Sequence, residues 1–305
     1  MERLLRVGTC LAMCGYGAQV GALAGTARAF RADAQLWAAH ARHRGPGGRT
    51  ALMQAAWTGN VSRILFLLER GADVEAVEAT GESALMLACY SGHCEAARLL
   101  VEHGGASANA AMTNDGFTAL IWASQEGHLE IVRFLVERGG ASVNPALTTN
   151  GQTALMLASQ NGHLETVRFL VERGGANLNA AAATGSTALT LSSEKGHLEI
   201  VRFLVERGGA SVNAPRTTDG MTALMFAGQN GHVEVVSFLL LRGAHVNAAR
   251  ALCGRTPLMF ASMMGHVAAV RLLLEHGALK RLTSHSGRTA HYFAASHPLV
   301  LAALE

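Results

Sequence analysis

Six histidines recur along the chain at intervals of 34 or 35 residues, and each follows a glycine: His93, His128, His163, His197, His232 and His266. Histidine binds zinc, so a metal site is the first chemistry to test against this pattern. Zinc needs several ligands about 2 Å from one ion, whereas equivalent positions in stacked helical layers lie about 8 to 10 Å apart. We therefore expect these histidines to be structural and expect no bound metal.

The five cysteines give no other site, because their number is odd and their spacing follows no paired pattern: Cys10, Cys14, Cys89, Cys94 and Cys253. This favours free thiols in a reducing compartment, with Cys89 and Cys94 as small buried or interfacial side chains. The sequence contains no glycine-rich phosphate loop, nucleophile elbow or carboxylate pair outside the repeated pattern. We expect no enzymatic activity and no cofactor.

A repeated helix positions these side chains. The segment 127–144, GHLEIVRFLVERGGASVN, returns unchanged at 196–213, and a near-copy occupies 162–179. Ile131, Val132, Leu135 and Val136 have helical spacing and form an apolar stripe. We expect the glutamates and arginines between them to form ion pairs on the solvent side and the two following glycines to end the helix.

The same design extends over eight units, the last one shortened, that begin at Gly48, Gly81, Gly116, Gly151, Gly185, Gly220, Gly254 and Gly287. Each opens with Gly, one variable residue and Thr or Ser, whose hydroxyl can cap a first helix. A Gly-His pair then permits a tight turn into the second helix. A period of this size indicates a solenoid, and we divide the chain into an N-terminal arm, 1–47, and a repeat array, 48–305.

The pattern resembles the ankyrin repeat over residues 48–305. The closest local matches are Gly71-Ala72-Asp73-Val74 after a second helix and Thr256-Pro257-Leu258 at the start of a first helix. The resemblance implies an all-α solenoid of stacked helix-turn-helix units joined by short hairpin loops. It also implies that the repeated histidine bonds backbone between helices, and that the array binds another protein through its concave face.

Variable positions on this frame are the candidate binding residues. The resemblance places them after each repeat glycine and before each inter-helix glycine: Trp57, Tyr90, Phe117, Gln125, Gln152, Gln160, Met221, Gln229, Met263 and Met264. Large apolar groups at exposed positions anchor interfaces. We expect Trp57, Tyr90 and Phe117 to form one exposed patch, and Met221, Met263 and Met264 to form a second patch toward the other end.

The N-terminal arm carries seven arginines up to Arg49 but only Glu2 and Asp33 as acids, and 7–27 is uncharged. A signal peptide, a transmembrane helix, an organellar transit peptide and a degenerate helical cap or plain arm remain alternatives for residues 1–47. The array has 18 basic and 20 acidic side chains in 50–305, so we expect no direct nucleic-acid binding. Membrane contact is expected only if residues 1–47 insert.

We predict an intracellular, monomeric protein-binding scaffold in the cytoplasm or nucleus. One alternative is an adaptor or anchor that residues 1–47 direct to an organelle or membrane. The other is a structural array whose near-identical units have no evolved partner. The sequence does not name the partner.

Overall fold

Each full unit begins where a hydroxyl side chain caps a short inner helix. In the computed structural model, which describes residues 48–305, Thr118 Oγ1 accepts a hydrogen bond from the backbone N–H of Ile121. Thr50, Ser83, Thr153, Thr187, Thr222 and Thr256 cap the helices of their units in the same way. The capping expected from the sequence is confirmed in these units, whereas Thr289 of the last unit makes no side-chain cap. The expectations for residues 1–47 lie outside the described range.

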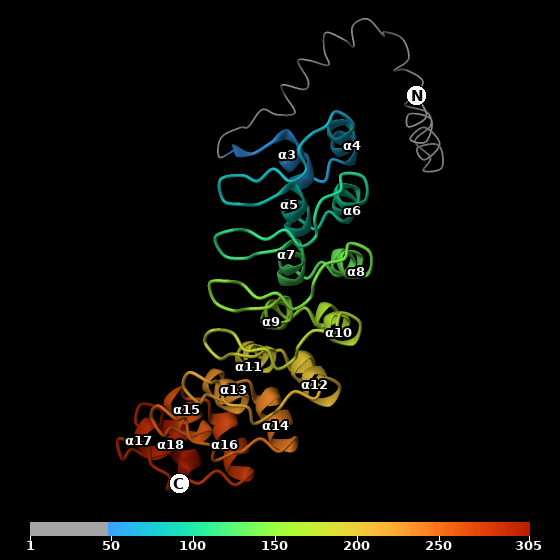
Figure 1. Ribbon diagram of the computed structural model, residues 1–305. Helices are drawn as coiled ribbons and strands as arrows, with labels where there is room; N and C mark the ends of the chain where they lie inside the picture. The colour runs from blue at the N-terminus through green and yellow to red at the C-terminus, as the bar shows by residue number, and fades with distance from the viewer. Residues whose placement is uncertain (1–47) are drawn as a thin grey trace, which may run out of the picture.

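Inner and outer helices alternate along the described chain (Figure 1). The inner helices are α3 (Ala51–Trp57), α5 (Ala84–Tyr90), α7 (Ala119–Gln125), α9 (Ala154–Asn161), α11 (Ala188–Lys195), α13 (Ala223–Asn230), α15 (Pro257–Met263) and α17 (Ala290–Phe293). The outer helices are α4 (Val61–Glu69), α6 (Cys94–Glu102), α8 (Leu129–Glu137), α10 (Leu164–Glu172), α12 (Leu198–Glu206), α14 (Val233–Leu241), α16 (Val267–Glu275) and α18 (Pro298–Leu304).

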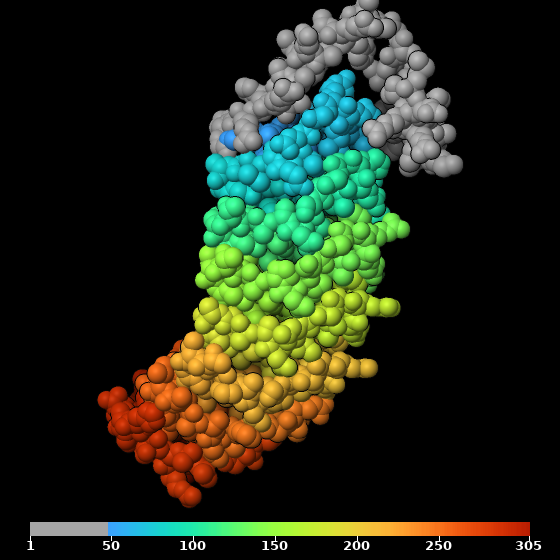
Figure 2. All heavy atoms as spheres, viewed as in Figure 1, coloured from blue at the N-terminus to red at the C-terminus, as the bar shows by residue number. Residues whose placement is uncertain are grey.

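The units stack into an elongated column in which each unit forms its own band (Figure 2). Inner helices pack on inner helices and outer helices on outer helices of the next unit. Loops project from the inner-helix side, and the C-terminal units bend toward that side (Figure 1). Isolated antiparallel bridges occur in three of these hairpins, such as Ala111 with Thr118, and no sheet is built from them in residues 48–305. The all-α solenoid predicted from the sequence is therefore confirmed.

The core is built from small and branched side chains on facing helix surfaces. Ile131, Val132 and Leu135 of α8 are fully buried, while Val136 is half-buried. The outward ion pairs form in two copies of this helix, between Glu165 and Arg168 and between Glu199 and Arg202. No helix of the described part reaches the length of about 20 apolar residues that crosses a bilayer.

The histidines hold neighbouring units together. His128 Nε2 donates to the backbone carbonyl of Tyr90 in the preceding unit, at 3.0 Å. His93, His163, His197, His232 and His266 make the corresponding bond at 2.9 to 3.0 Å. The structural role implied by the resemblance is confirmed. The structure adds that each bond joins two neighbouring units. His297, which follows no glycine, makes the same bond to Met263.

Asparagines form a second series of links that sequence reasoning missed. Asn144 donates to the carbonyl of Gly175 and accepts from the N–H of Asn177, so one side chain joins the loops of two units. Asn109, Asn213 and Asn247 make the same pair of bonds. The repeated Val-Asn, or Ala-Asn at Asn109, was the signal in the sequence that could have revealed this role.

Candidate interaction groove

We call the surface between the hairpins and the inner helices the groove. It carries the side chains that vary from unit to unit. Among the candidates, Trp57 and Tyr90 are 37 and 39% exposed and Met264 is 47% exposed. Phe117, Met263 and the four glutamines Gln125, Gln152, Gln160 and Gln229 are half-buried. The outer face, in contrast, repeats the same glutamates and arginines.

The three aromatic candidates of the first patch are joined through a fourth ring. Trp57 and Tyr90 stack with ring centroids 5.5 Å apart and planes 14° apart. Trp122 stands perpendicular to Tyr90 at 5.1 Å and stacks on Phe117 at 4.2 Å. Such arrangements are the favourable geometries for aromatic pairs. The structure therefore brings Trp57, Tyr90 and Phe117 into one cluster.

Trp122 was missed because it lies inside a first helix and not at a helix end or loop. The equivalent residue is Gln54 in the first unit, Leu87 in the second and Phe226 in the sixth. That variation in size and polarity was the available signal, since a position that serves only the shared core would hold similar side chains. The Trp122 Nε1 donor is buried and has no hydrogen-bond partner in the described structure.

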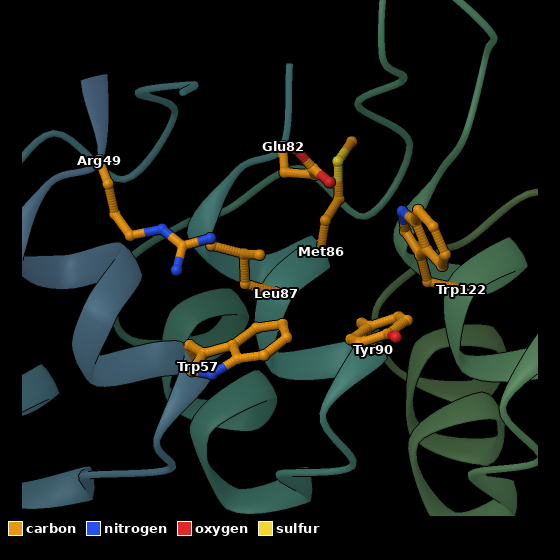
Figure 3. A pocket seen from close by; sticks show the side chains of 7 residues that line it. All are labelled: Arg49, Trp57, Glu82, Met86, Leu87, Tyr90 and Trp122. Carbon is orange, nitrogen blue, oxygen red and sulfur yellow. The ribbon is translucent and has the colours of Figure 1, made fainter. Parts of the chain in front are cut away.

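Three of these rings, Trp57, Tyr90 and Trp122, border a cavity of about 290 Å³ that we call the aromatic pocket. Its lining residues are Arg49, Trp57, Glu82, Met86, Leu87, Tyr90 and Trp122 (Figure 3). Arg49 and Glu82 come from the hairpin side, and the other five come from α3, α5 and α7. The pocket thus has aromatic and apolar walls and charged side chains at its rim.

Charge at this rim is not balanced. Arg49 donates two hydrogen bonds to Glu78, at 2.8 and 3.1 Å, and this pairing lowers the pKa of the Glu78 carboxyl. Glu82 accepts a hydrogen bond from Thr80 Oγ1. Among the described residues, one arginine therefore faces two carboxylates, which leaves one net negative charge beside the rings.

The prediction that Met221 belongs to a second exposed patch is wrong. Its side chain is 2% exposed and packs with Met225, Phe226 and Phe260. A flexible thioether side chain next to two phenyl rings gains free energy by covering them, and here it turns inward. Met263 packs against this cluster, so among the three methionines only Met264 is largely exposed.

Arginines border the groove near the C-terminal units instead. Arg216 and Arg250 both bond the buried Asp219, each with an N–O distance of 2.6 Å. Arg255 and Arg288 follow the next two repeat glycines and lie over the rings of Phe293 and Tyr292, respectively. Residues 242–305 contain seven basic and two acidic side chains, whereas 50–241 contain 11 and 18. The near-neutral array inferred from the sequence is in fact strongly polarised along its length.

The middle of the groove is polar and uncharged at the glutamine positions. Gln152 Nε2 donates to Gln160 Oε1 at 3.1 Å, and Gln125 Nε2 donates to Glu126. The carbonyls of Gln125, Gln160 and Gln229 accept the histidine bonds described above. The glutamine backbones are thus structural, whereas their side chains line the groove between the aromatic pocket and the arginines.

Other candidate chemistry gains no geometric support. Cys89 is fully buried and Cys94 half-buried, as expected, and burial raises the pKa of the Cys89 thiol. Within residues 48–305, no three His, Cys, Asp or Glu side chains are grouped so that they could hold a metal ion. Freedom from metal in the purified protein remains a prediction.

Comparison with known proteins agrees with this geometry. A family model for ankyrin repeats in three copies matches residues 52–146, 105–182, 140–216, 175–250 and 224–304. The Notch-regulated ankyrin repeat-containing proteins of Xenopus tropicalis and Xenopus laevis are each 43% identical over 49 residues, which is 16% of this chain. The match spans 43% of the length of each relative. Because the family model covers nearly all of the described residues, this chain belongs to the ankyrin repeat family.

Proposed function

We propose that this protein is a scaffold that holds a segment of a partner protein in the groove between its hairpins and inner helices. Ankyrin repeats are in general non-enzymatic modules for protein–protein interaction. The observation that carries the proposal is the pair Trp57 and Tyr90, which remain more than one-third exposed although each stacks on the other. Exposed aromatic side chains beside a cavity are typical anchors of protein interfaces.

Two further features support the groove over the outer face. The groove changes from aromatic and acidic through uncharged amides to arginine, so it offers a partner a directional pattern. The outer helices α8, α10 and α12 have nearly the same sequence. A surface that repeats itself offers no unique register to a bound segment, whereas the groove does.

The test combines affinity capture with substitution. The full chain is used as bait in a lysate of its source cells, and the captured protein is then titrated against variants. Trp57→Ala or Tyr90→Ala should weaken binding about five- to thirtyfold, which corresponds to about 1 to 2 kcal/mol, and Met264→Ala tests the other end of the groove.

Arg133→Ala and Arg168→Ala on the outer face are the controls and should change affinity less than twofold. Their guanidinium groups lie over Phe169 and Phe203, so the melting temperature of each variant is measured as well. If the outer-face changes abolish binding and the groove changes do not, the partner does not use the groove.

A further inference from the structure

The aromatic pocket forms a corner that leaves ring faces open. Trp57 and Tyr90 lie nearly in parallel and form its floor, and Trp122 forms a wall at about a right angle to Tyr90 (Figure 3). Phe117 stacks against Trp122 and supports this wall. The face of an aromatic ring carries partial negative charge and attracts a cation.

Residues 48–305 place a cation over only part of this floor. The Arg49 guanidinium lies 5.6 Å from the centroid of Trp57. Within residues 48–305, no arginine or lysine lies over Tyr90 or Trp122. Arg49 is also neutralised by Glu78, which leaves the Glu82 carboxylate as the net charge at the rim. Rings and charge both favour a positively charged occupant at Tyr90.

The size and shape of the pocket narrow the choice of cation. Ligand pockets for whole small molecules span about 300 to 1,000 Å³, so a cavity of about 290 Å³ suits the end of one side chain. A rounded ammonium head contacts both the floor and the wall of a right-angled corner. A planar guanidinium stacks on one ring face only.

We propose that the aromatic pocket receives the ammonium head of a lysine side chain, unmodified or methylated on its nitrogen, from the bound partner. Tyr90 and Trp122 contact the head, and Glu82 supplies the opposite charge. The apolar side chains of Met86 and Leu87 contact the methylene stem. This assignment rests on the proposed function only in taking the partner to be a protein.

The test uses single capped residues, so it needs no knowledge of the partner. The probes are Nα-acetyl-lysine methylamide, its Nε-trimethyl form and the norleucine analogue, which keeps the stem and lacks the charge. The indole N–H signals of Trp57 and Trp122 are followed by nitrogen-15 NMR in the full chain carrying Trp37→Phe, which leaves two tryptophans. Both lysine probes should shift both signals, with norleucine at least fivefold weaker. A comparison of the two lysine probes shows whether methylation improves binding.

Substitutions then assign the contacts. Tyr90→Leu, which keeps an apolar side chain but removes the ring, should weaken the lysine probes about five- to thirtyfold, and Tyr90→Phe should restore them. Glu82→Gln should weaken them about threefold and reduce their sensitivity to salt. Tyr292→Leu is the matched control, since Tyr292 is an exposed tyrosine on α17 outside the pocket. Melting temperatures verify that each variant is folded.

The assignment is overturned if norleucine binds as well as lysine, if no probe shifts either indole signal at about 50 mM, or if Tyr90→Leu binds like the unaltered chain. Loss of partner capture in Trp57→Ala, together with no response to the lysine probes, would leave the groove function intact and exclude the lysine. Lysine probes that bind, together with capture that ignores the groove variants, would support the lysine site and exclude the groove function.

Discussion

Asp219 is the side chain on which two consecutive hairpins depend. It is 6% exposed, and it accepts hydrogen bonds from Arg216 and Arg250 and from the backbone N–H of Met221. Arg216, which donates two of these bonds, is the main reason that the pKa of Asp219 lies well below its usual range. A carboxylate held this way stabilises the folded protein only while it is ionised.

Asp219→Asn should therefore lower stability at pH 7 by about 1.5 to 3 kcal/mol, the range for hydrogen bonds to charged groups. The depressed pKa gives stability that is fully present above the unfolded value of about 4 and is lost as the pH falls through the folded value. The difference between variant and unaltered chain should hence shrink below pH 4. Urea midpoints at pH 7, 4 and 2.5 measure it, and a difference that stays constant would contradict the ionic role.

The residue scale is also where sequence reasoning failed. Met221 was predicted to be exposed because it follows a repeat glycine, yet the equivalent positions range from buried Ser186 to exposed Arg288. The backbone position is repeated, but the direction of each side chain depends on neighbours in the adjacent unit. For Met221, these neighbours include Phe260, 39 positions away in the sequence. Periodicity cannot reveal such contacts, and it cannot reveal Trp122 as the link between Tyr90 and Phe117.

At the scale of the helix pair, the glycine before each histidine has two separate roles. Gly127 has a φ of 74°, and a Cβ atom at this position would overlap the imidazole of His163 in the next unit. Gly140 has a similar φ of 68°, but a Cβ atom there would meet nothing within 4 Å. The two glycines are thus a natural pair for separating backbone strain from close packing.

Gly140→Ala should cost about 1 kcal/mol, because only the left-handed backbone penalises alanine there. Gly127→Ala should cost at least about 2 kcal/mol, because the imidazole must also move and weaken its bond to the Gln125 carbonyl. Urea midpoints of both variants give the comparison. Equal losses would mean that the overlap with the imidazole costs no stability. In a chain that already carries His163→Ala, Gly127→Ala should cost no more stability than Gly140→Ala does.

The last helix pair is built more weakly than the others. Helix α17 has four residues and no side-chain cap, whereas the other inner helices have seven or eight residues and a cap. Only Ala290, Ala294, Val300 and Leu304 of this unit are buried hydrophobic residues. Backbone amides of α17 and α18 should therefore exchange with solvent at least about tenfold faster than those of α9 to α12. Hydrogen-exchange mass spectrometry tests this, and equal protection would contradict it.

The fold of residues 48–305 was predictable from the sequence because its stabilising contacts lie within one unit or join neighbouring units. Caps, turns and histidine bonds recur with the sequence period, so the pattern of one unit predicts the others. The distribution of charge was not recognised, although the sequence contains it. A sum over 50–305 hides an acidic stretch, 50–241, and a basic one, 242–305.

This polarity gives a prediction for binding at the whole-molecule scale. A partner that occupies the full groove should carry basic side chains toward unit one and acidic side chains toward unit eight, and its affinity should fall as salt screens both contacts. Raising NaCl from 50 to 500 mM should weaken binding of the captured partner about tenfold or more through a lower association rate. Surface plasmon resonance measures the association and dissociation rates separately. An association rate that does not depend on salt would exclude this orientation.

The identical segments 127–144 and 196–213 also suggest how the number of repeat units in such a chain can change. Because each histidine reaches back only one unit, excision of residues 127–195 would present His197 to the Tyr90 carbonyl in place of His128. Outer helix α12 has the same sequence as α8, so it meets α6 and α7 with the same side chains. The new contacts are those of α7 and its hairpin with α13 and its hairpin, and the bond of His232 to the Gln125 carbonyl in place of the Glu194 carbonyl. The shortened chain should fold with unchanged helix content per residue and a proportionally smaller urea m-value. Recombination between the two copies would thus add or remove two whole units, and each product would still fold. The distance between the arginines and the aromatic pocket would change, and with it the partner that fits the groove.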